Sequence, residues 1–189
     1  MPKSTVMGRP NQLRKAFQVL NPKGHFIVLP SLTETIITVR DAELQQIDGD
    51  RERFRLYKRG YVAQYFEAWK TISEDLLQLD KAYLEIYTPP VDSKRYELIA
   101  LHCDPSLRNT DVHYKYKSGP HLHFNGAINP IPDAHITLYL DKNDLVYGDI
   151  ETFNKFLKDY LTLIKLQILD PIKAGDETQF KLPKIKKLD

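Results

Sequence analysis

The sequence predicts one α+β domain, in which an antiparallel β-meander sheet carries two long amphipathic helices packed on one face. Three observations lead to this prediction. Short runs of β-branched and aromatic residues follow one another between turn residues, as in a series of strands. Two stretches carry apolar residues at three- and four-residue spacing, which is typical of helices. The turns are too short for the crossover of a parallel pair, so neighbouring strands are expected to be antiparallel.

The chain of 189 residues has the length of a single domain, and no linker or repeat divides it. Residues 1–22 mix Lys, Arg, Pro, Gly and Asn without periodicity, so we expect a loosely ordered N-terminal arm. Residues 23–172 are expected to form the single α+β domain, and residues 173–189 a basic C-terminal tail.

The first expected elements are a hairpin and a helix. His25 to Leu29 and Thr35 to Val39 are short strand-like runs, and the turn residues Pro30 and Ser31 stand between them. From Gly60 to Leu77, large apolar residues recur at helical spacing, with charged residues between them. This pattern predicts an amphipathic helix over that stretch.

The second half of the chain continues with strands and ends in a helix. Ala82 to Tyr87 and Tyr96 to Cys103 predict an antiparallel pair. Three further runs predict strands at His113–Lys117, His121–Phe124 and His135–Leu140. Apolar residues from Ile150 to Ile164 recur at helical spacing, so they predict a second amphipathic helix, with Asp149 as its N-cap and Pro171 just past its end.

Composition excludes several classes of protein. Cys103 is the only cysteine, which excludes an intramolecular disulfide and a cysteine-rich zinc site. The apolar runs are too short for a bilayer span or a signal peptide, so a cytoplasmic protein with no membrane association is expected. The formal net charge is only +2, yet Arg51, Arg53, Arg55, Lys58 and Arg59 form a basic run. That run is either a solvated face or a contact for phosphates.

Histidines gather in one part of the sequence. Four of the six lie between His113 and His135, and His102 precedes them in a neighbouring expected strand. Alternate residues of a strand share a face, so His121 and His123 point the same way, while Leu122 points oppositely. The same rule places His135, Thr137 and Tyr139 together. If the aliphatic residues face the helices, the histidines lie together on the other face.

Clustered imidazoles support two chemistries. They can bind one divalent metal, zinc or manganese, for which His121, His123, His135 and His113 are the candidate ligands. Asp104, Asp111 or Asp133 could add a carboxylate. Without a metal, paired histidines can act as base and acid on a phosphodiester. We therefore expect a phosphodiester hydrolase of nuclease or phosphoesterase type that acts on a nucleic acid or nucleotide. The expected catalytic residues are His121, His123, His135 and Thr137. The expected substrate-binding residues are Lys115, Lys117 and Tyr139.

One segment matches part of a known family signature. His135-Ile136-Thr137-Leu138 resembles one half of the signature of the 2H phosphoesterases, in which two such motifs face each other and cleave phosphodiesters. The nearest second motif, His121-Leu122-His123-Phe124, lacks the hydroxyl residue of that signature. The resemblance therefore covers four residues and does not assign the chain to that family.

Two alternatives remain open from the sequence. Each histidine can instead be a hydrogen-bonded polar residue of a half-buried strand. The same face, rich in tyrosine and histidine, can instead hold a protein partner, which would make the chain a noncatalytic binding subunit of a larger assembly. Cys103 is expected to be a buried structural thiol, because its neighbour His102 points to the opposite face.

Overall fold

The structure is a computed structural model of the whole chain. The structure describes residues 1–48, 53–90, 93–104, 120–124, 134–138 and 150–170. The predicted strand at His113–Lys117, the predicted cap Asp149, Pro171 and the predicted tail over 173–189 lie outside these residues. In the described part, no helix is both long and apolar enough to cross a membrane.

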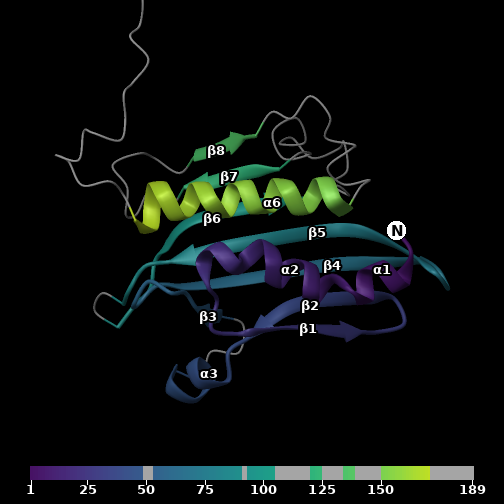
Figure 1. Cartoon of the computed structure of the whole chain (residues 1–189), viewed down its shortest axis with the longest axis horizontal. Helices are drawn as coiled ribbons and strands as arrows, with labels where there is room; N and C mark the ends of the chain where they lie inside the picture. Colours follow the sequence, from purple (N-terminus) through teal and green to yellow (C-terminus); the bar gives the residue numbers. More distant parts are fainter. Residues whose placement is uncertain (49–52, 91–92, 105–119, 125–133, 139–149, 171–189) are drawn as a thin grey trace, which may run out of the picture.

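One antiparallel sheet forms the body of the molecule, as the sequence predicts (Figure 1). Its strands follow the order β1, β2, β4, β5, β6, β7, β8, and the short strand β3 pairs with β4 beside β2. From β4 onward each strand lies beside the next in sequence, so this part is a meander. The strand bounds are β1 His25–Pro30, β2 Glu34–Arg40, β3 Arg53–Arg55, β4 Val62–Ser73, β5 Leu76–Tyr87, β6 Glu97–Cys103, β7 His121–Phe124 and β8 Ala134–Thr137.

The helices lie at both ends of the chain. The N-terminal segment forms α1 Lys3–Met7 and α2 Arg9–Phe17, followed by a 3₁₀ turn over Gln18–Leu20. The C-terminal helix is α6 Ile150–Ile164, which continues as a π-helical turn over Lys165–Leu169. A short helix, α3 Ala42–Asp48, lies beyond β2. Figure 1 shows α1, α2 and α6 crossing the same face of the sheet.

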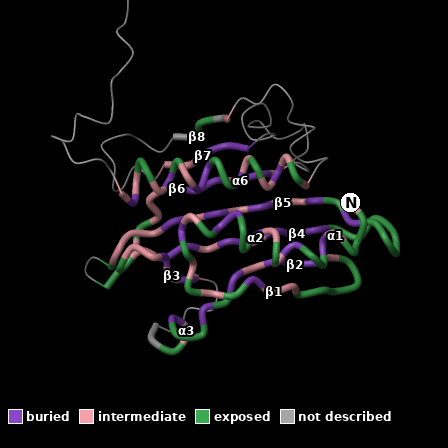
Figure 2. The backbone as a smooth tube through the Cα atoms, viewed as in Figure 1, coloured by how far each residue is buried: buried purple, intermediate pink, exposed green. Residues whose placement is uncertain are grey.

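The core lies between this face and the helices. Phe17 of α2 packs against Tyr65 of β4, with ring centroids 4.8 Å apart. Phe153, Leu157 and Leu161 of α6 are buried at helical spacing, as the sequence predicts. Buried and exposed residues alternate along α2 and α6 in Figure 2, as expected of helices with one face on a core. Cys103 is buried in this core, which confirms its expected structural place.

The expected helix from Gly60 to Leu77 is wrong, because this stretch forms β4 and the start of β5. Its apolar residues lie on both faces of a strand, so their spacing imitates a helix: Tyr65 and Trp69 point to the core, while Phe66 lies on the other face. Glu67, which the helical pattern places among exposed residues, is buried. The Arg9 guanidinium neutralises it from 58 residues away in sequence, which no local pattern reveals.

The expected loosely ordered arm over residues 1–22 is also wrong. Val6, Leu13, Phe17 and Leu20 have no exposed surface and belong to the core. The segment begins with Met1, whose backbone oxygen accepts a hydrogen bond from the Leu77 amide at 2.8 Å. The N-terminal helices therefore take the place on the sheet that the sequence pattern assigned to residues 60–77.

Candidate metal centre

Two neighbouring strands bring three histidines together on the sheet face opposite the helices. In the β6–β7 ladder, His102 stands directly opposite His121, and Ala100 stands opposite His123. Directly paired residues of antiparallel strands share a face, and His123 follows His121 by two residues. The paired residues Leu101 and Leu122 point the other way and are buried in the core. Burial of these leucines thus fixes the face on which the histidines lie.

The three imidazoles are close enough to act on one ligand. Ring centroids lie 4.0 Å apart for His102 and His123, 4.9 Å for His121 and His123, and 5.8 Å for His102 and His121. One nitrogen from each ring lies within 4.8 Å of the other two. A tetrahedral zinc site, with Zn–N bonds of about 2.0–2.1 Å, needs nitrogens about 3.3 Å apart. The farthest pair would therefore approach by about 1.5 Å around an ion, a change within reach of side-chain rotation.

Burial differs among the three rings. His121 has no exposed surface, while the side chain of His102 keeps 19% of its exposure and His123 is half-buried. His121 is thus buried although it lies on the face that the helices do not cover. The more exposed pair leaves one side of the cluster within reach of water or substrate.

A carboxylate stands beside the cluster. Glu85 Oε1 of β5 lies 3.7 Å from His102 Nε2, longer than a direct hydrogen bond. The Tyr87 hydroxyl donates a 2.5 Å hydrogen bond to Glu85 Oε2. The His102 imidazole, against the opposing effect of burial, holds the pKa of Glu85 below its usual range. Glu85 is thus ionised and placed to orient His102, as carboxylates commonly orient metal-binding histidines.

Aromatic rings support the other side of His102. The ring of Tyr83 lies on His102 with centroids 4.2 Å apart, and Phe66 meets Tyr83 edge-on at 5.0 Å. The Tyr83 hydroxyl donates a 2.6 Å hydrogen bond to Asp104 Oδ1. Burial and this carboxylate raise the pKa of Tyr83 well above its usual value, so the phenol stays neutral. Asp104, a candidate carboxylate ligand by sequence, therefore serves as a hydrogen-bond acceptor for Tyr83.

The remaining sequence candidates are placed only in part. In the β7–β8 ladder, Thr137 pairs with His121 and His135 pairs with His123, so β8 extends both rows of the cluster. The side chains of His135 and Thr137 lie outside the described part. Further predicted residues also lie outside it, namely His113, Lys115, Lys117, Tyr139, Asp111 and Asp133.

Sequence reasoning treated His102 only as an addition to the cluster and missed Glu85 and Tyr83 entirely. In the expected strand Ala82 to Tyr87, alternation alone indicates that Tyr83 and Glu85 lie on the same face. The register that sets Tyr83 opposite His102, and His102 opposite His121, comes only from the folded sheet.

Comparisons with known proteins add no assignment. The chain matches no protein-family profile, no curated protein and no solved structure. Function is therefore inferred from the geometry of the cluster.

Proposed function

We propose that the protein is a phosphodiester hydrolase whose centre is a divalent metal, zinc or manganese, held by His102, His121 and His123. One observation supports this most: three imidazoles from adjacent strands offer nitrogens within 4.8 Å of one another. Three histidine ligands leave a coordination position for water, which is the arrangement of catalytic zinc sites rather than structural ones. Glu85 supports the proposal, because it supplies the outer carboxylate that such sites commonly have.

The proposed chemistry follows from that open position. A metal held by His102, His121 and His123 would make a water in the open position acidic enough to serve as the nucleophile at neutral pH. In the hydrolysis, water oxygen would form the new P–O bond, the bond to the leaving oxygen would break, and the proton released by the water would balance the one taken up by the leaving oxygen. His135 and Thr137, predicted from the sequence, would act from β8 on the proton and on a phosphate oxygen. Lys115, Lys117 and Tyr139 are proposed to contact the substrate.

An activity assay with matched variants tests the proposal. Protein purified without chelator is incubated with zinc or manganese and either bis-(p-nitrophenyl) phosphate or a labelled RNA strand. Wild type and His25→Ala should cleave, because His25 is an exposed histidine on the far strand β1. His121→Ala and His123→Ala should lose at least about 100-fold in rate, since each removes a ligand. Circular dichroism checks that each variant is folded. Full activity in either variant would contradict the proposal.

A second candidate function is a noncatalytic subunit that binds a protein on the same face. A hollow of about 410 Å³ supports it, because its lining includes partly exposed apolar side chains, those of Ile27, Leu29, Ile36 and Phe66. This reading predicts that a partner co-purifies with the wild type and with the His121→Gln, His123→Gln variant, but not with Leu29→Lys. A monomeric protein that retains no partner would count against it.

A further inference from the structure

A second pocket on the sheet carries many positive charges. It has a volume of about 660 Å³, within the usual range for ligand sites, and its walls come from four separate stretches of chain. The basic side chains that line it are Lys23, Arg53, Arg55, Arg59 and Arg95. None of the described lining residues is acidic. The basic run in the sequence supplies only three of the five, so the fold itself concentrates this charge.

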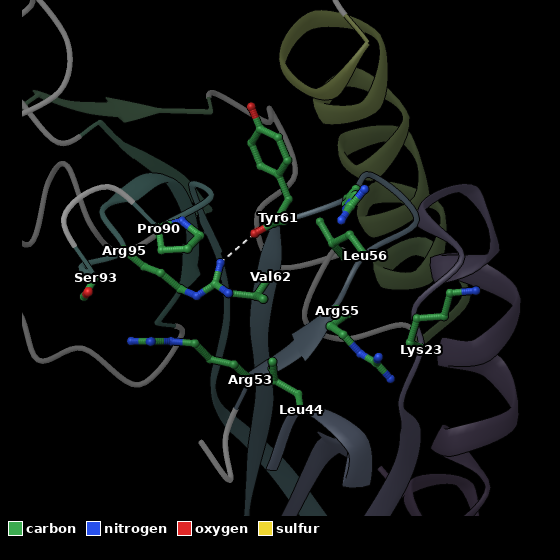
Figure 3. A pocket seen from close by; sticks show the side chains of 12 residues that line it. Lys23, Leu44, Arg53, Arg55, Leu56, Tyr61, Val62, Pro90, Ser93 and Arg95 are labelled. Carbon is green, nitrogen blue, oxygen red and sulfur yellow. Dashed lines mark hydrogen bonds between the residues drawn. The ribbon is translucent and has the colours of Figure 1, made fainter. Parts of the chain in front are cut away.

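Several of these cations are held in place. The Arg95 guanidinium donates hydrogen bonds to the carbonyls of Gly60 at 2.6 Å and Thr88 at 3.1 Å, and both of these acceptors are uncharged. The Arg53 guanidinium lies 4.1 Å from the ring centroid of Tyr87. Figure 3 shows Arg53 and Arg95 to one side of Val62, and Arg55 and Lys23 to the other. Such fixed guanidinium groups suit phosphate, which they bind through paired hydrogen bonds.

Arg55 has a different part in the pocket. It is paired with Asp41 at 2.8 Å and Glu43 at 2.5 Å, so these carboxylates compensate its charge. Lys23 and Arg59 are exposed and reach the pocket from its rim. Gly60, whose φ of 86° lies in the left-handed region, makes the turn that separates Arg59 from Tyr61. Tyr61, Leu56 and Pro90 add an apolar wall on which a base or sugar can rest.

The pocket and the histidine cluster lie on one face of the sheet. Arg53 pairs with Gln64, Gln64 with Glu85, Glu85 with Ala100, and Ala100 with His123. Directly paired residues share a face, so one row of the sheet joins the pocket to the cluster. The four steps along this row from β3 to β7 span about 19 Å at the usual strand spacing. A single mononucleotide is too short to occupy both sites, whereas a strand of several nucleotides can.

We propose that this basic pocket binds phosphate groups of a single nucleic-acid strand, part of which lies along the sheet face toward His102, His121 and His123. Placing the bond to be cleaved at the histidines rests on the proposed function; binding of phosphates in the pocket does not. The same phosphate chemistry is available from a free nucleotide, so the test must separate a strand from a mononucleotide.

The test measures binding in the absence of cleavage. Anisotropy of a fluorescein-labelled RNA of ten nucleotides is followed with wild type in chelator, and gel electrophoresis confirms that the strand stays intact. The pocket variant, Lys23→Glu, Arg59→Glu, reverses the charge of two exposed residues that line the pocket. The control variant, Lys3→Glu, Lys158→Glu, makes the same change of net charge on exposed residues of the helices that cover the other face. The milder variant Arg59→Ala serves if the double reversal does not fold.

We expect the pocket variant to bind the strand at least about ten-fold more weakly than wild type, with a shallower dependence on salt, because phosphate contacts are lost. The control should stay within about two-fold of wild type. Equal weakening in both variants, or in neither, would overturn the inference. If adenosine monophosphate displaces the labelled strand at a concentration equal to that of the strand, the strand is not the preferred ligand and the pocket is assigned to a free nucleotide. If the pocket variant loses binding but wild type supplied with metal does not hydrolyse the strand, the binding pocket is supported and the proposed hydrolase function is contradicted.

Discussion

Glu67 shows how a single residue can be misjudged from sequence. Its carboxylate accepts hydrogen bonds from the Arg9 guanidinium, from the Tyr65 hydroxyl at 2.5 Å and from the Trp69 indole at 2.9 Å. Both Arg9 and Glu67 have no exposed surface. Arg9 also donates to the amide oxygen of Asn154 in α6, so one ion pair ties both long helices to β4.

Glu67→Gln should therefore be strongly destabilising, because it leaves the Arg9 charge buried and uncompensated. Breaking a buried pair in this way costs about 3–5 kcal/mol. Urea unfolding of the variant measures the loss, and Glu74→Gln, which alters an exposed carboxylate, is the control. A difference below about 1 kcal/mol would mean that the pair contributes little to the fold.

Asp41 gives a prediction about pH. Its buried carboxylate accepts hydrogen bonds from the Leu44 amide at 3.1 Å and from the amide and guanidinium of Arg55. Burial alone would raise the pKa of Asp41, but these hydrogen bonds and the Arg55 charge hold it below its usual value. A lowered pKa in the folded state means that ionised Asp41 stabilises the protein above its unfolded pKa of about 4.

Asp41→Asn should thus be less stable than wild type at pH 7. Wild type loses this stabilisation as pH falls through the lowered pKa of the folded state, so the difference between the two proteins should shrink below about pH 4. Thermal unfolding across that range measures it. A difference that stays constant with pH would show that ionisation of Asp41 does not contribute.

Among the residues of the candidate metal centre, His121 and His123 could be grouped from the sequence alone, because alternation within one short run sets both on one face. It did not rank His102 beside them or find Glu85. Those positions depend on which residues pair across strands, and the pairing is decided by burial of Leu101 and Leu122 against distant helices. Local patterns carry no information on such register.

At the scale of elements, patterns succeed where an element has one buried side. Buried residues alternate along β2 and recur at helical spacing along α6, and the structure confirms the hairpin of β1 and β2 and the helix α6. β4 fails because its residues are buried on both faces, so a period of two is obscured. α2 was missed because only Leu13, Ala16 and Phe17 mark its apolar side among basic and polar residues.

Replacing residues of α2 tests whether this helix belongs to the core. Leu13→Ala should cost about 2–5 kcal/mol in the free energy of unfolding, because Leu13 has no exposed surface. Arg14→Ala, on the exposed side of the same helix, should change it by less than about 0.5 kcal/mol. If both variants changed the free energy of unfolding by similarly small amounts, residues 1–22 would instead be a loosely ordered arm.

At the scale of the whole molecule, the sequence predicted the antiparallel α+β class. It also predicted that the helices pack on one face of the sheet and that the histidines lie on the other. The helices and aliphatic side chains occupy one face. The histidine cluster and the basic pocket occupy the other. The net charge of +2 gives no hint of the pocket, but the basic run of the sequence supplies Arg53, Arg55 and Arg59. Only the fold brings Lys23 and Arg95 from separate stretches to join them.

The most direct test of the central claim is the metal content of the protein. Zinc or manganese is added to three untagged proteins: wild type, the His25→Ala variant, and the double variant His102→Ala, His121→Ala. Gel filtration removes unbound metal, and elemental analysis measures the metal that remains bound. We predict about one ion per chain in wild type and in His25→Ala, and almost none in the double variant, because two of three ligands are gone. Equal metal in all three proteins, or none in wild type, would contradict the metal centre.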